Sequence, residues 1–114
     1  MTKNKYEGPK NTHTFRDAEQ LWFWFISSAR IRTGLCRAGD AGMRPCEMVD
    51  IETFVTRLYL SGRLSRDQLV VMKQYGERRR APSQHVWAEN KDAAMWMDAM
   101  RTLQIAASAK GWIE

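Results

Sequence analysis

The amino-acid sequence predicts a small all-α domain, a compact bundle of four main helices with a fifth, short helix and a helix-turn-helix-like segment. Apolar residues recur at helical spacing in four separate segments, and capping residues or glycines bound most of them. No run of residues alternates between apolar and polar side chains as a half-buried strand does. With 114 residues, 44% of them hydrophobic, the chain can bury one core.

Residues 1–13 predict a flexible basic tail, and residues 14–114 predict a single domain. The tail is polar, contains Lys3, Lys5 and Lys10, and shows no apolar period. No apolar segment follows the first residues, and no apolar run reaches about 18 residues. We therefore expect a cytoplasmic protein without a membrane partner.

The first helix is expected over 15–33, with Thr14 as its cap and Gly34 at its end. It is apolar around most of its circumference, which is typical of a helix buried between others. The aromatic residues at 22–25 cannot all face one groove, because successive helical positions point about 100° apart. The last helix, Trp112 or a second subunit would have to cover the remainder, so a homodimer is one expectation.

The second helix is expected over 46–60, after a glycine-rich loop at 34–45. Acidic residues in its first turns complement the helix dipole. The third helix has the clearest start, because Ser65 and Gln68 fit a capping box. Gly76 is expected to end it.

Two further helices are expected after the third. Pro82 interrupts the chain, and Ser83 can cap a short helix through 84–87. Asn90 is expected to cap the last helix, from 91 to about 110, and a glycine follows it. The two apolar residues after that glycine are expected to pack back on the domain.

The side chains expected in the core share one face of each helix. They are Trp22, Phe25, Leu58, Leu69, Met72, Trp96, Met100 and Leu103.

The sequence contains no phosphate-binding glycine loop, no G-x-S-x-G motif and no H-E-x-x-H motif. We therefore expect no enzyme and no cofactor. Cys36, Cys46 and His85 lack the paired spacing typical of structural zinc, so we expect no metal site. The two cysteines are expected to be thiols rather than a disulfide, as cytoplasmic cysteines usually are.

Positive charge is concentrated in one part of the chain. The formal net charge is +5, and the window from Arg57 to Arg80, with seven basic and two acidic residues, carries the same net charge. Such a field favours a polyanionic partner, either nucleic acid or an acidic protein.

Part of this window resembles a known DNA-binding motif. Leu64-Ser65-Arg66-Asp67-Gln68-Leu69, then Val71-Met72 and Tyr75-Gly76, resembles the opening helix of sigma-factor region-four domains and related phage regulators. The resemblance covers about thirteen residues, and beyond Gly76 an arginine run, Pro82 and a Trp replace the usual second helix. It implies a DNA-binding regulator of bacterial or phage type, without establishing membership of that family.

Double-stranded DNA is accordingly the expected partner. We expect the arginines to contact phosphates, and Gln84 and His85 to reach base edges in the major groove. The candidate residues are Arg66, Lys73, Arg78, Arg79, Arg80, Gln84 and His85.

Two alternatives stay open. The segment 77–85 can equally be a solvated basic loop without a specific role. The whole chain can be a protein-interaction module, an adaptor or inhibitor that docks on a larger complex, because its aromatic and Met content is high for a small core.

Overall fold

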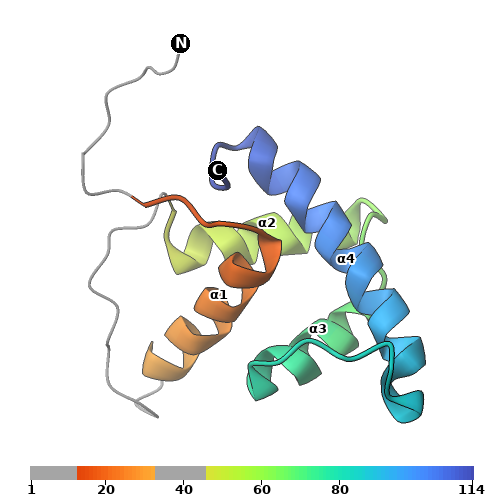
Figure 1. The fold of residues 1–114 in the computed structure, drawn as a ribbon. Coiled ribbons are helices and arrows are strands. Elements are labelled where there is room, and N and C mark those ends of the chain that lie inside the picture. Colours follow the sequence, from red (N-terminus) through yellow and green to blue (C-terminus); the bar gives the residue numbers. More distant parts are fainter. Residues whose placement is uncertain (1–12, 33–45) are drawn as a thin grey trace.

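The computed structural model describes residues 13–32 and 46–114. The predicted tail, except for His13, and the predicted loop at 34–45 with Cys36 lie outside the described residues. The described elements are α1 (Ala18–Arg32), α2 (Met48–Leu60), α3 (Arg66–Arg78), the 3-10 helix η1 (Trp87–Glu89) and α4 (Asn90–Ala109) (Figure 1). No strand occurs among residues 13–32 and 46–114, which confirms the all-α prediction with four main helices. None of these helices is long and apolar enough to cross a membrane.

Helix α1 begins at Ala18 rather than at residue 15, so the expected cap at Thr14 was wrong. Asp17 Oδ1 accepts a hydrogen bond from Gln20 N at 2.9 Å, which is the contact of an N-cap. Phe15 is held in an extended pairing instead. Its N–H donates to Trp112 O at 2.9 Å, and its carbonyl accepts from Glu114 N at 3.0 Å.

This pairing joins the two ends of the domain. Phe15 and Ile113 form an isolated parallel bridge, and both side chains are buried. The expectation that the residues after Gly111 pack back is therefore confirmed. The C-terminal residues also explain why Phe15 lies outside the helix.

The starts of α2 and α3 are set by local side-chain contacts. At α2, Glu47 N donates to Asp50 Oδ2 at 2.8 Å. At α3, the predicted capping box is confirmed, because Gln68 N donates to Ser65 Oγ at 3.1 Å and Ser65 N donates to Gln68 Oε1 at 2.8 Å.

Helix α3 continues past Gly76, which was wrongly expected to end it. The last helical residue is Arg78, and Arg79 forms the C-cap with a φ of 57° in the left-handed region. Gly76 is buried where α3 meets α1, and a Cβ there would lie 2.8 Å from Trp22 Nε1. This glycine therefore serves a close approach of two helices rather than a helix end.

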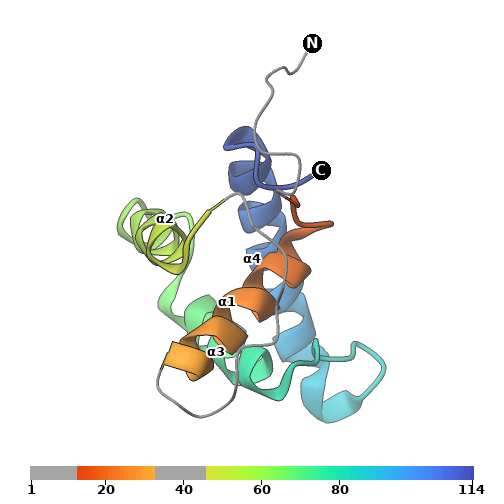
Figure 2. The same cartoon turned by 90° about the vertical axis from the view of Figure 1, so that its left-hand side faces the viewer.

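Helix α1 packs against α3 and α4 and also contacts α2, so it is the central helix as predicted. Figure 2 shows α2 almost end-on, beside α1 and α4. The aromatic residues at the start of α1 find partners within the chain. Phe23 stacks on Trp96 with ring centroids 5.7 Å apart, and Trp24 lies 5.5 Å from Phe15. Contacts within the chain thus cover these rings only in part, and the homodimer stays a prediction.

Most of the predicted core is buried, and two members are not. Phe25 and Leu69 are only half-buried, at the edge of the cluster. The core also contains large side chains outside those eight. The largest of these are Phe15, Leu21, Ile51, Phe54, Leu64 and Tyr75.

Candidate nucleic-acid interface

The solvent face of α3 carries Arg66 and Lys73. Both are exposed, whereas Val71, Met72 and Tyr75 on the opposite side are buried. Residues seven apart share one face of a helix, and the 13 residues of α3 span about 20 Å. Neither Arg66 nor Lys73 forms an ion pair with any described residue, so both charges are available to a ligand.

Two more arginines lie at the C-terminal end of α3, and Arg78 is on the side of Tyr75 rather than on that of Arg66 and Lys73. The guanidinium of Arg78 lies 5.1 Å from the centroid of the Tyr75 ring, a cation–π distance that leaves its charge intact. Arg79 is exposed and, within residues 13–32 and 46–114, has no carboxylate partner. The three arginines were expected beyond the helix end, but Arg78 is the last residue of α3 and only Arg79 and Arg80 follow it.

Arg80 differs from its two neighbours because its charge is already paired. Its two terminal nitrogens donate to Glu89, with Nη2 at 2.7 Å from Oε2 and Nη1 at 3.1 Å from Oε1. Glu89 Oε1 also accepts from Ser83 N at 2.8 Å. The Arg80 hydrogen bonds, and then that of Ser83, lower the pKa of Glu89 to about 2. Glu89 is thus a carboxylate of η1 that holds Arg80 and Ser83 of the loop after α3.

Gln84 and His85 are exposed on a turn, and the predicted fifth, short helix lies at Trp87–Glu89 (η1) rather than at 84–87. His85 N donates to Ser83 Oγ at 3.2 Å. Asn90, expected as a cap, lies at the first position of α4, and its side chain donates to Gln84 O at 2.9 Å. These contacts, with Pro82 before them, hold the segment in a turn followed by η1.

The expected helix-turn-helix is therefore incomplete in this structure. Residues 61–65 join α2 and α3 by a short turn, but after α3 comes a loop and a three-residue 3-10 helix. A helix-turn-helix places a second α-helix in the major groove. No described segment directly after α3 is of that kind, so Gln84 and His85 are not carried by a recognition helix.

The same loop exposes a residue that the sequence analysis did not assign to the site. Trp87 is 92% exposed, more than any other large hydrophobic side chain described. The signal for it was the absence of an apolar residue three or four positions away on either side. An exposed indole beside a basic surface can stack on nucleic-acid bases.

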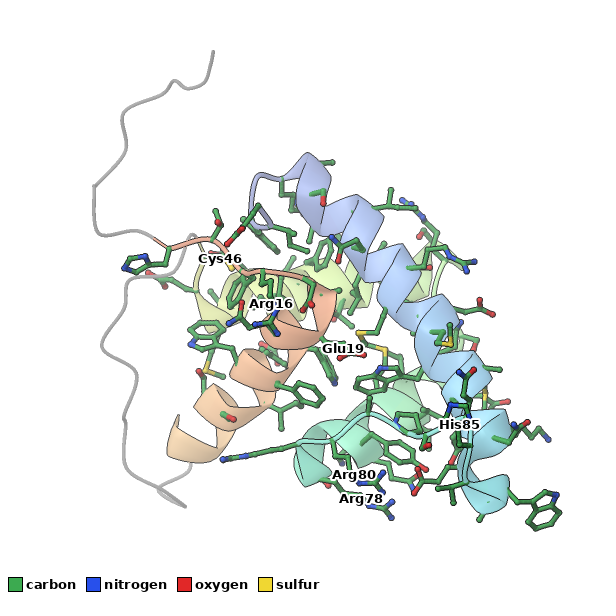
Figure 3. All side chains as sticks on the ribbon, in the orientation of Figure 1. Arg16, Glu19, Cys46, Arg78, Arg80 and His85 are labelled. Atoms are coloured by element: carbon green, nitrogen blue, oxygen red, sulfur yellow. The ribbon has the colours of Figure 1, made fainter. Side chains whose placement is uncertain are left out.

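The structure also separates two of the three residues considered for a metal. Cys46 and His85 lie at opposite ends of the molecule in Figure 3, so they cannot share one ion. Within the part of the chain that the structure describes, no group of three His, Cys, Asp or Glu residues could hold a metal.

Comparison of this chain with protein-family models, with curated proteins and with solved structures finds no match.

Proposed function

We propose that the protein is a small, non-catalytic nucleic-acid-binding regulator, with double-stranded DNA as its expected ligand. One observation carries the proposal. Arg66, Lys73 and Arg79 are exposed along one helix and its C-cap, and none of them has an ion-pair partner among the described residues. Unpaired cations along one helix are complementary in charge to a phosphate backbone.

The geometry supports phosphate contacts more than recognition of base sequence. The cations lie on a helix face and at its end, whereas Gln84 and His85 lie on a turn. Phosphate contacts orient a protein on the duplex but carry no sequence information directly. We therefore expect weak sequence preference and an affinity that falls steeply with salt.

The test is a salt titration of binding to a fluorescently labelled DNA duplex longer than α3. Each neutralised phosphate contributes about 0.9 to the slope of log K against log salt. The double variant Arg66→Ala/Lys73→Ala should lower affinity and flatten the slope by about two units. Circular dichroism should show unchanged helicity, because both side chains are exposed.

The matched control is Arg16→Ala/Arg101→Ala. Both of these arginines are exposed, and each lies beside a carboxylate, Asp17 and Asp98 respectively. The control removes the same charge away from α3 and should keep the wild-type slope. Absence of binding at low salt, or equal losses in both double variants, would refute the proposal.

A further inference from the structure

A groove lies along α2 and faces the C-terminal end of α4. Its volume is about 700 Å³, which is within the range of ligand-binding sites. The lining residues come from α2, the turn after α2, the end of α4 and the C-terminal segment. None of the residues assigned to nucleic-acid binding lines it.

The floor of the groove is aromatic and apolar. Phe54 is only 5% exposed, and its ring meets that of Trp112 edge to face, with centroids 5.1 Å apart. Leu58 lies beside them in the lining. A floor of this kind favours a ligand with large apolar side chains, because their burial releases water from both surfaces.

The rim of the groove is basic. Arg57, Arg63 and Lys110 line it, against the single carboxylate of Asp50. That carboxylate already accepts the hydrogen bond from Glu47 N that begins α2. No described carboxylate pairs with the three cations, so the rim favours an anionic ligand.

Lys110 connects the rim with the floor. Its Nζ lies 5.4 Å from the centroid of the Trp112 ring and 5.9 Å from that of Phe54. The ammonium is thus held over the two rings by cation–π attraction while one side stays open to a ligand. A bound peptide would therefore contact Lys110 both with an apolar side chain on the floor and with a carboxylate.

The length of the groove favours a peptide over a small molecule as its ligand. The lining residues run from Val49, in the first turn of α2, to Arg63, beyond its end. The 13 residues of α2 span about 20 Å, the length of a helical peptide of similar size. Binding of an amphipathic helix in a groove is a common mode of peptide recognition.

We propose that this groove binds an acidic amphipathic peptide segment of a partner protein. Its apolar side chains lie on Phe54 and Trp112, and its carboxylates face Arg57, Arg63 and Lys110. The site is separate from the basic face of α3, so the protein joins a peptide partner and a nucleic acid through different surfaces.

The experiment selects peptides from a random library displayed on phage, about 12 residues each and so about 18 Å as helices. The full chain is the bait. The variant Ala109→Trp, which fills the groove from an exposed position on α4, is used to remove peptides that bind elsewhere. Enriched peptides should combine Asp or Glu with Leu, Phe or Trp at helical spacing. Amide NMR shifts caused by one enriched peptide should map to the groove.

Variants then distinguish this site from the nucleic-acid surface. Arg57→Glu/Lys110→Glu should weaken the enriched peptide about tenfold or more, since both charges are reversed at exposed positions. Arg66→Ala/Lys73→Ala should bind the peptide as the wild type does, even if this variant no longer binds DNA.

Two results would overturn the proposal: no enrichment once the peptides that also bind Ala109→Trp are removed, or enrichment of peptides without acidic residues. Shifts of the groove amides on addition of duplex DNA, with no effect of the peptide, would assign the groove to nucleic acid instead.

Discussion

The indole of Trp22 lies directly against the backbone of α3 at Gly76. Trp22 Nε1 donates to Met72 O at 2.8 Å in the buried interior, and a Cβ built on Gly76 would lie at the same distance from that nitrogen. The contact satisfies a buried polar group and sets the separation of α1 from α3. It requires the smallest residue at position 76.

We predict that Gly76→Ala destabilises the domain by about 1–2 kcal/mol. Alanine is the better helix former by about 1 kcal/mol. The new methyl group would, however, lie 3.0 Å from Ile26 Cγ1 and 2.8 Å from Trp22 Nε1, which is held by its hydrogen bond to Met72 O. Urea denaturation followed by circular dichroism measures the effect. Gln74→Ala, at an exposed position of α3, is the control and should change little.

A double-mutant cycle tests whether the clash at position 76 is with Trp22. Trp22→Phe removes the indole nitrogen, so Gly76→Ala should cost less in that background. Additive effects of the two substitutions on the free energy of unfolding would show that the contact with Trp22 does not determine which residue fits at position 76.

The sequence could predict what depends on local chemistry. The capping box of Ser65 and Gln68 was recognised because both its residues lie within one turn. Gly76 was misjudged because its role depends on a side chain from another helix, distant in the sequence. Phe15 was placed in a helix for the same reason, because its pairing partner lies at the other end of the chain.

In the candidate site, too, the sequence could predict local features but not those that depend on tertiary structure. Charge along the sequence predicted the exposed cations of α3, because a solvent face needs no tertiary information. The Arg80–Glu89 pair depends on how the loop folds back, which spacing alone does not show. The groove lined by Phe54 and Trp112 depends on the position of the C-terminal segment against α2.

We predict that Arg79→Gly stabilises the domain by about 0.5–1 kcal/mol. Arg79 is the one non-glycine residue with positive φ among those described, at 57°, and this conformation strains any residue with a Cβ. Thermal unfolding followed by circular dichroism measures the gain. Arg79→Ala retains the Cβ and should not be stabilised, so an equal gain in both variants would contradict the strain argument.

We predict that Trp96→Ala is far more damaging than Phe25→Ala. Trp96 is 2% exposed, and its Nε1 donates to Glu19 Oε2 at 2.8 Å, whereas Phe25 is half-buried. Loss of Trp96 should cost about 3–5 kcal/mol, enough to unfold a marginal domain. Phe25→Ala should leave a cooperative thermal transition. Similar losses in the two variants would place Phe25 in the core as the sequence suggested.

The Arg80–Glu89 pair predicts a specific pH dependence. The pKa of Glu89 is lowered from 4.5 to about 2, so the folded state favours the carboxylate. Its contribution to stability is therefore complete above about pH 4.5 and is lost as the pH falls toward 2. The stability difference between wild type and Glu89→Gln should shrink over this interval. In a carboxyl NMR titration, Arg80→Ala should raise the pKa of Glu89, and an unchanged pKa would contradict the assignment.

The same pair makes a prediction for nucleic-acid binding, which rests on the proposed function. Glu89→Gln removes the carboxylate that neutralises Arg80, next to the exposed Arg79. The released guanidinium can then contact a phosphate, so DNA affinity should rise and the salt slope should steepen by about 0.9. Asp98→Asn is the matched control, because it releases Arg101 on α4 with the same change of net charge. If both variants strengthen binding equally, the effect is one of net charge, and the C-terminal end of α3 is not the place where DNA binds.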